Sequence, residues 1–296
     1  MLDLDEATNN ALREIDLATL RGLRLQAHVA HRARRVGDRV GKGVGGRVEF
    51  VDHRPYAPGD DLRRVDWNAA ARTDRLVVKR HAHDSALPVH LGIDLSRSMG
   101  VGDPSALAIA QEVARGLAYV ALSGGATVTV VGLARSPVTV ATVSRRGGLS
   151  AVETALRALH THGDADVGRA LRAYAGRARD TGVFVLLTDM LDGAGARECL
   201  RSLRPFESSV VHLISAALFA DPTSGPLRVQ DAETGAERDL VWDDSAASAY
   251  ARRRDELLRH MPSLAAGLGI RYASVRTDRV GPDVFIKEFR NAGIVG

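Results

Sequence analysis

The stretch PVHLGIDLSRSMG, residues 88–100, places side-chain oxygens directly after an apolar run. Asp94, Ser96 and Ser98 follow a predicted strand that ends at Ile93, in an Asp-x-Ser-x-Ser spacing. Carboxylate and hydroxyl oxygens are hard ligands of the kind that Mg²⁺ and Mn²⁺ prefer. At the carboxyl end of a parallel strand, side chains project into the crevice in which open α/β sheets bind ligands. The spacing therefore predicts a divalent-cation site at this strand end.

A second apolar run, VFVLLTDMLD, ends in the same way. Asp189 terminates the run and Asp192 lies just beyond it. If both strands belong to one parallel sheet, the two carboxylates approach one another at its carboxyl edge. The structural alternative is that these Asp and Ser side chains cap a helix and hydrogen-bond their own loops. Both interpretations remain open from the residues alone.

The elements that must position these residues follow an α/β pattern. Five apolar runs, separated by segments of helical period, predict strands that are buried on both faces of a sheet. We therefore expect an α/β fold with a mostly parallel, doubly wound sheet and helices on both faces. Residues 126–134 and 136–143 should pair as antiparallel strands. The five runs are VHLGID, VTVVGLA, VFVLLTD, VVHLISA and IRYASV.

Three regions are expected along the chain. Residues 1–36 predict an N-terminal helix, residues 37–85 a small β-rich subdomain, and residues 86–296 the α/β domain, with a hairpin near 226–243. In the α/β domain, Asp103 is a plausible N-cap of the first connecting helix, with Pro104 in its first position. Further helices are predicted at 149–161, 166–178, 194–204, 245–266 and 282–291.

Composition narrows the classes of function. No stretch approaches eighteen uncharged apolar residues and the N-terminus is acidic, which predicts a cytoplasmic protein without a membrane span. Cys199 is the single cysteine, so neither an internal disulfide nor a cysteine-based metal site is expected, and a structural, partly buried thiol is predicted. Residues 31–80 hold 13 Lys and Arg against 7 Asp and Glu. Their interleaved charges favour local ion pairs over nucleic-acid binding.

Several enzyme motifs do not fit their required context. Gly41-x-Gly43-x-x-Gly46 precedes a β-like stretch and not a helix, so it predicts a glycine loop and not a dinucleotide site. A Gly-x-Ser-x-Gly nucleophile motif is missing around Ser96 and Ser98. A phosphatase with Asp94 as nucleophile would need a second Asp two positions on, where Ser96 stands.

With these residues in view, the sequence resembles a von Willebrand factor type A domain. The metal-ion-dependent adhesion site of that family uses Asp-x-Ser-x-Ser after the first strand, a Thr in a second loop and an Asp after a later strand. Asp94, Ser96 and Ser98 match the first element and Asp189 matches the last. In GDADVGRAL, Ala165 stands at the Thr position, between Asp164 and Asp166. The resemblance implies Mg²⁺ or Mn²⁺ as cofactor, with water, Asp164 or Asp166 in place of the Thr.

Residues 45–80 contain Glu-Phe, then Arg-x-Tyr-x-Pro-Gly-Asp-Asp-x-Arg-x-Val-Asp-Trp, and then Ala-Arg and a β-like segment. This stretch resembles the signature of a bacterial family known as domain of unknown function 58. The resemblance implies an adaptor or chaperone-like role with a MoxR-type AAA+ ATPase and unknown client proteins. Read physically, the stretch offers either an ion-pair network that holds the subdomain to the α/β domain or a surface for a partner. Its candidate residues are Arg54, Tyr56, Asp60, Asp61, Arg63, Arg64, Asp66 and Trp67.

Three hypotheses of function follow. The leading one is a non-enzymatic protein-interaction module, whose metal-site face recognises a protein and serves an AAA+ ATPase. The second is a metal-assisted hydrolase that uses Asp94 and Asp189, although no convincing general base or nucleophile accompanies them. The third is nucleic-acid binding through the basic segment 31–80.

Overall fold

A computed structural model divides the chain into two compact units, residues 1–31 with 87–296 and residues 32–86. The larger unit carries every residue of the predicted metal site. The structure describes residues 15–27, 50–55, 65, 67–73, 76–81, 86–144, 148–163, 165–178, 181–189 and 193–296.

The larger unit is built on a six-stranded sheet in the order β10-β7-β6-β3-β4-β5. Neighbouring strands are parallel except β5, which pairs antiparallel with β4. The predicted mostly parallel sheet and its antiparallel pair are thus confirmed. The strands are β3 (Pro88–Asp94), β4 (Thr127–Leu133), β5 (Pro137–Val143), β6 (Val183–Thr188), β7 (Glu207–Ile214) and β10 (Arg271–Arg276).

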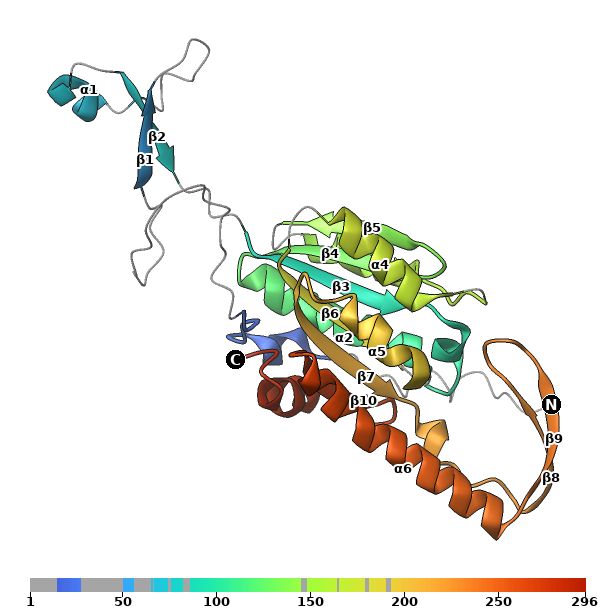
Figure 1. Ribbon diagram of the computed structural model, residues 1–296. Helices are drawn as coiled ribbons and strands as arrows, with labels where there is room; N and C mark the ends of the chain where they lie inside the picture. The colour runs from blue at the N-terminus through green and yellow to red at the C-terminus, as the bar shows by residue number, and fades with distance from the viewer. Residues whose placement is uncertain are drawn as a thin grey trace. The chain divides into compact units, whose positions relative to one another are not determined.

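Helices cover both faces of this sheet (Figure 1). In β6, Val185 belongs to the core cluster that includes α2, whereas its neighbours Phe184 and Leu186 belong to the cluster of the opposite face. This alternation explains why the strand is apolar throughout, because both of its faces are covered. The first face carries α2 (Ala106–Ser123), α3 (Leu149–Arg157) and the π-helical turn η7 (Val284–Phe289). The second carries α4 (Val167–Arg177), α5 (Gly193–Arg201) and α6 (Asp244–Gly267).

The predicted N-terminal helix is wrong over the part that the structure describes. Within residues 15–27, only the 3₁₀ turn η2 (Leu17–Leu20) is helical, and Gly22 then takes a φ of 91° that ends it. Leu25 bridges to Val295, so the segment runs extended beside the C-terminus. Packing of Ile15 and Leu20 into the core has overridden the helical period of the sequence.

The helix after β3 begins two residues later than predicted. Its N-cap is Ser105, whose hydroxyl accepts a hydrogen bond from the backbone N–H of Ala108 at 3.2 Å. Asp103 is therefore not the cap, and Pro104 precedes the helix. Between β3 and α2 lies the 3₁₀ turn η4 (Arg97–Gly100), which contains Ser98 of the predicted site and has Ser96 as its N-cap residue.

A β-hairpin stands in the connection between β7 and α6, where a hairpin was expected. Its strands are β8 (Gly225–Gln230) and β9 (Glu237–Trp242), and the 3₁₀ turn η6 (Ala216–Phe219) precedes them. Gly235 adopts a φ of 72° in the tip, a conformation that favours glycine. Figure 1 shows this hairpin arching from the start of α6 toward the edge of the sheet at which β3 ends.

The smaller unit holds an antiparallel pair, β1 (Phe50–Pro55) and β2 (Val77–His81), and a short helix α1 (Trp67–Thr73) that the sequence did not predict. Arg54 lies in β1 opposite Val78, and Trp67 opens α1 with 60% of its surface exposed. The remaining network candidates, Tyr56, Asp60, Asp61, Arg63, Arg64 and Asp66, lie outside the described residues. The ion-pair network therefore stays a prediction.

Within the described residues, every helix is too short or too polar to cross a bilayer. The cytoplasmic location expected from the sequence stays a prediction.

Candidate functional site

The register of the parallel strands brings the two predicted strand ends together. Ile93 of β3 pairs with Leu187 of β6, so the next residues, Asp94 and Thr188, lie side by side at the carboxyl edge. Strand order also reverses between β3 and β6, because β4 follows β3 on one side and β7 follows β6 on the other. Such a switch point is where open α/β sheets bind ligands.

The Asp94 carboxylate is held by a hydrogen bond on each oxygen. Its Oδ2 accepts from the Thr188 hydroxyl at 2.6 Å, and its Oδ1 accepts from the backbone N–H of Ser96 at 2.8 Å. Asp94 is 3% exposed and Thr188 is 2% exposed. The buried carboxylate is thus fixed in one orientation at the edge of the sheet.

The two serines complete the cluster with Asp189. The Oγ atoms of Ser96 and Ser98 lie 3.2 Å apart, and the Ser98 hydroxyl donates to the Asp189 carboxylate. Met99, fully buried in the turn η4, anchors this loop in the core. All four principal predicted residues are therefore in one place.

The ionised form of both carboxylates is disfavoured by their surroundings. Burial raises the pKa of Asp94, although its hydrogen bonds from Ser96 and Thr188 act in the opposite direction. Burial, and then the nearby charge of Asp94, raises the pKa of Asp189 to about 7. Among the described residues, no Lys or Arg forms an ion pair with either carboxylate. A positive charge bound between them would remove this cost.

His212 of β7 hydrogen-bonds to the backbone of Asp189. No sequence pattern predicted this role. Because a carbonyl oxygen only accepts, Nε2–H must donate to the Asp189 carbonyl at 2.7 Å, which leaves Nδ1 to accept from the Tyr272 hydroxyl at 2.7 Å. Burial lowers the pKa of His212 to about 4. The imidazole is therefore neutral, and both of its nitrogens are used in holding the strand end.

Glu233, from the tip of the hairpin, is the second residue that sequence analysis missed. Its Oε1 accepts from the backbone N–H of Ser98 at 2.7 Å and its Oε2 accepts from that of Arg97 at 3.2 Å. The contact joins residues 135 apart in the chain. The one signal in the sequence was the predicted hairpin near 226–243, but the sequence does not predict the direction in which that hairpin points.

Of the other predicted ligands, the structure describes Asp166, which does not join the cluster. Asp166 is exposed and caps α4, where its Oδ1 accepts from the backbone N–H of Arg169 at 2.8 Å. Asp164 and Asp192 lie outside the described residues. Although Ala165 offers no hydroxyl, Thr188 brings a threonine hydroxyl to Asp94 from β6.

Cys199 is a free, half-buried thiol whose pKa burial raises to about 12, as expected for a structural cysteine.

The donor set fits a hard divalent cation better than a softer metal. Within the described part of the chain, no three His, Cys, Asp or Glu side chains gather in a metal-binding geometry. An ion here would thus be held by the carboxylates of Asp94 and Asp189, the hydroxyls of Ser96 and Ser98, and water. Mg²⁺ characteristically binds through one or two carboxylates and keeps several waters.

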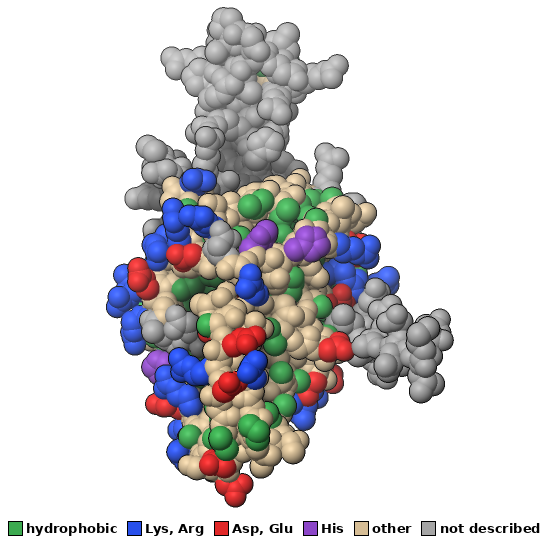
Figure 2. Space-filling view, turned by 90° about the vertical axis from the view of Figure 1, so that its right-hand side faces the viewer, with side chains coloured by type: hydrophobic (Ala, Val, Ile, Leu, Met, Phe, Trp, Pro, Cys, Tyr) green, Lys and Arg blue, Asp and Glu red, His purple; other side chains and the backbone are tan. Residues whose placement is uncertain are grey.

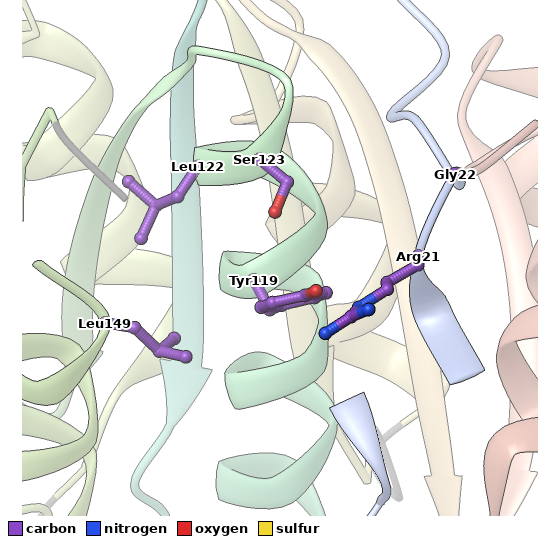
Figure 3. A pocket seen from close by; sticks show the side chains of 6 residues that line it. All are labelled: Arg21, Gly22, Tyr119, Leu122, Ser123 and Leu149. Atoms are coloured by element: carbon purple, nitrogen blue, oxygen red, sulfur yellow. The ribbon is translucent and has the colours of Figure 1, made fainter. Parts of the chain in front are cut away.

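A separate cavity of about 560 Å³ lies at the other end of α2 (Figure 3). The Arg21 side chain points toward the Tyr119 ring across it. The cavity shares no residue with the Asp94 cluster, and the described residues around it include no acidic side chain. It is lined by Arg21, Gly22, Tyr119, Leu122, Ser123 and Leu149.

Fold and site together define a doubly wound α/β protein with an oxygen-lined cluster at its switch point. Residues 52–257 match the family model described as "Protein of unknown function DUF58", and the chain belongs to that family. The chain is 29% identical to "Uncharacterized protein Rv1480" of Mycobacterium tuberculosis and, to the same degree, to "Uncharacterized protein Mb1516" of Mycobacterium bovis. Each alignment covers 82% of this chain and 79% of the relative.

Two solved structures are similar in fold. A "von Willebrand factor type A from Catenulispora acidiphila" is 18% identical with a TM-score of 0.41, over 74% of this chain and 43% of that one. The "conserved hypothetical protein BatB from Bacteroides thetaiotaomicron" is 16% identical with a TM-score of 0.40, over 66% of this chain and 92% of that one.

Proposed function

We propose that this protein is a non-enzymatic interaction module that binds a divalent cation at the Asp94 cluster and there recognises an acidic side chain of a protein partner. The observation that carries the proposal is the convergence of four oxygen-bearing side chains at the switch point. Asp94, Ser96 and Ser98 come from one loop, and Asp189 comes from the neighbouring strand end.

The chain's own residues prepare this site for a cation. Thr188 and the backbone of Ser96 orient the Asp94 carboxylate, while His212 holds the backbone of Asp189. The two carboxylates lack a cationic side-chain partner in the described structure, which leaves their negative charge for a bound ion. Mg²⁺ or Mn²⁺ bound there would supply an electrophilic position for an additional oxygen ligand.

The chemistry of the neighbouring His212 supports the proposed non-enzymatic role. His212, which hydrogen-bonds to the backbone of Asp189 at the strand end, is buried with both nitrogens engaged, so it does not serve as a general base.

The partner class comes from the family resemblance of residues 45–80. We propose a MoxR-type AAA+ ATPase, with this chain as adaptor toward client proteins.

Calorimetric titration of the full chain with Mg²⁺ and Mn²⁺ tests the cation site. We expect a heat of binding that Asp94→Asn abolishes, whereas Asp239→Asn, a change in an exposed hairpin residue, leaves it intact. Loss of binding in Ser96→Ala or Ser98→Ala would support the assigned ligands. A wild-type chain that binds neither ion would contradict the proposal.

Affinity capture with a MoxR-type ATPase tests the partner. The full chain should retain the ATPase in Mg²⁺ and release it in EDTA, and Asp94→Asn should behave like the EDTA sample. Equal capture under all three conditions would show that the cluster is not the recognition face. No capture under any condition would exclude this ATPase class as the partner.

A further inference from the structure

The β8–β9 hairpin brings a carboxylate of its own to the candidate site. Both oxygens of Glu233 are engaged, one by the N–H of Ser98 and the other by the N–H of Arg97. These two residues lie inside the Asp-x-Ser-x-Ser loop. An intramolecular acidic side chain therefore contacts the loop that we propose recognises acidic partners.

The hairpin tip is built to present Glu233. The Asp231 Oδ1 accepts from the backbone N–H of Glu233 at 2.9 Å and from that of Thr234 at 2.7 Å. The backbone N–H of Gly235 donates to the Asp231 carbonyl at 2.8 Å, which closes the turn. Because hydrogen bonds within the turn fix its backbone, the tip is preorganised to present Glu233 to the site.

Outside its two ends, the hairpin is largely exposed. At its base, the Trp242 Nε1–H donates to Asp221 at 3.0 Å and the indole contacts the Tyr250 ring edge to face. Between base and tip, Val241 is 65% exposed and the Arg228–Asp239 ion pair faces solvent. The contacts of Glu233 thus attach the tip to the Asp-x-Ser-x-Ser loop.

Charge opposes this attachment. Glu233 lies close enough for its charge to raise the pKa of both Asp94 and Asp189, so the three carboxylates repel one another. Two backbone N–H groups attract Glu233, while two buried carboxylates push it away. Figure 2, which shows the face at the right-hand side of Figure 1, has acidic and basic side chains interspersed over it. This balance of attraction and repulsion is suited to a contact that another carboxylate can replace.

We propose that Glu233 is an internal occupant of the recognition site, and that a protein partner binds by replacing it with an acidic side chain on an exposed turn. The inference rests on the proposed function, because it takes the Asp94 cluster as the recognition site. It also names the partner's binding element, a carboxylate on a turn like residues 231–236.

Hydrogen–deuterium exchange of the full chain tests the internal contact. In Glu233→Ala we expect the amides of Arg97 and Ser98 to exchange about tenfold faster than in the wild type, because each loses a charge-assisted hydrogen bond. Glu237→Ala is the matched control, since it lies in the same hairpin and is exposed but does not contact the loop. Equal exchange in wild type and Glu233→Ala would overturn the inference.

A labelled synthetic peptide of residues 225–242 tests the replacement by fluorescence anisotropy, in Mg²⁺ and again in EDTA. The Glu233→Ala chain should bind the peptide about tenfold more tightly than the wild type, because its own occupant is gone. A peptide that carries Ala at the Glu233 position should bind neither chain. Equal affinity of the two chains, or binding of the Ala peptide, would overturn the inference.

The two proposals fail in different ways. A wild-type chain that binds no Mg²⁺ contradicts the proposed function, and the EDTA arm then decides internal occupancy by itself. A chain that binds Mg²⁺ but shows no effect of Glu233→Ala on exchange or on peptide binding keeps the proposed function and removes this inference.

Discussion

Replacing Asp189 by Asn should stabilise the metal-free protein at pH 8 and leave its stability unchanged at pH 4. The folded-state pKa of Asp189, about 7, lies above the ordinary value of 3.8. A carboxyl whose pKa is raised by folding contributes fully below its unfolded-state pKa, and that contribution is lost as pH rises through the folded-state pKa. The wild type should therefore lose stability between about pH 4 and pH 7, whereas the Asp189→Asn variant should not.

The size of the effect follows from the same two values. The difference between 3.8 and about 7 corresponds to at most about 4 kcal/mol of unfolding free energy. Asp189 is 6% exposed, so solvent screens it little, but relaxation around a buried charge reduces the penalty. We expect Asp189→Asn to gain about 2 kcal/mol at pH 8 in EDTA.

Urea unfolding followed by far-ultraviolet circular dichroism measures this gain. Asp283→Asn is the control, because its side chain is 81% exposed and the change should stay within about 0.5 kcal/mol. Added Mg²⁺ should stabilise the wild type and not the Asp189→Asn variant. Destabilisation of the variant at pH 8 in EDTA would refute the view that the two carboxylates lack compensation.

Three further changes test neighbouring parts of the molecule. Thr188→Val keeps the shape but removes the 2.6 Å hydrogen bond to Asp94, and should cost about 2 kcal/mol in urea unfolding at pH 8; an unchanged midpoint would contradict the assigned geometry. His212, whose pKa is lowered from 6.5 to about 4, stabilises the fold above pH 6.5 and loses that contribution as pH falls toward 4, which amounts to at most about 3 kcal/mol. His212→Gln should therefore show a flatter acid-unfolding profile by circular dichroism, and a profile as steep as the wild type's would argue against a buried neutral imidazole. Gly92→Ala would place a Cβ 2.6 Å from the Phe184 ring and should cost about 1–3 kcal/mol; thermal scans that show no loss would mean that the ring moves freely.

The sheet was predictable because its signals are local. Continuous apolar runs such as Val183–Thr188 require cover on both faces, and the helices between them show a clear period. The segment from Ile15 onward shows the opposite case, since its helical period lost to pairing with the C-terminus at Val295. That outcome depends on residues some 270 positions away, which no local pattern contains.

The candidate site divides in the same way. The sequence predicted four residues of the cluster, because short stretches of sequence indicate both the end of a strand and the chemistry of a ligand. These residues are Asp94, Ser96, Ser98 and Asp189. Glu233 and His212 were not predicted, since their roles depend on the register of β7 and on the direction in which a hairpin points. The sequence therefore predicted the residues of the candidate cluster, but not Glu233 and His212, which hydrogen-bond to its backbone.

The hairpin is inserted in a connection that leaves the sheet from its carboxyl edge, between β7 and α6. Among the described strands, none of the six-stranded sheet hydrogen-bonds to β8 or β9. Its length and tip residues can therefore change without altering the ladder that fixes Asp94 and Asp189. Within such a scaffold, specificity could diversify by exchange of one surface loop, with the buried cluster kept constant and the competing tip adjusted to each new partner.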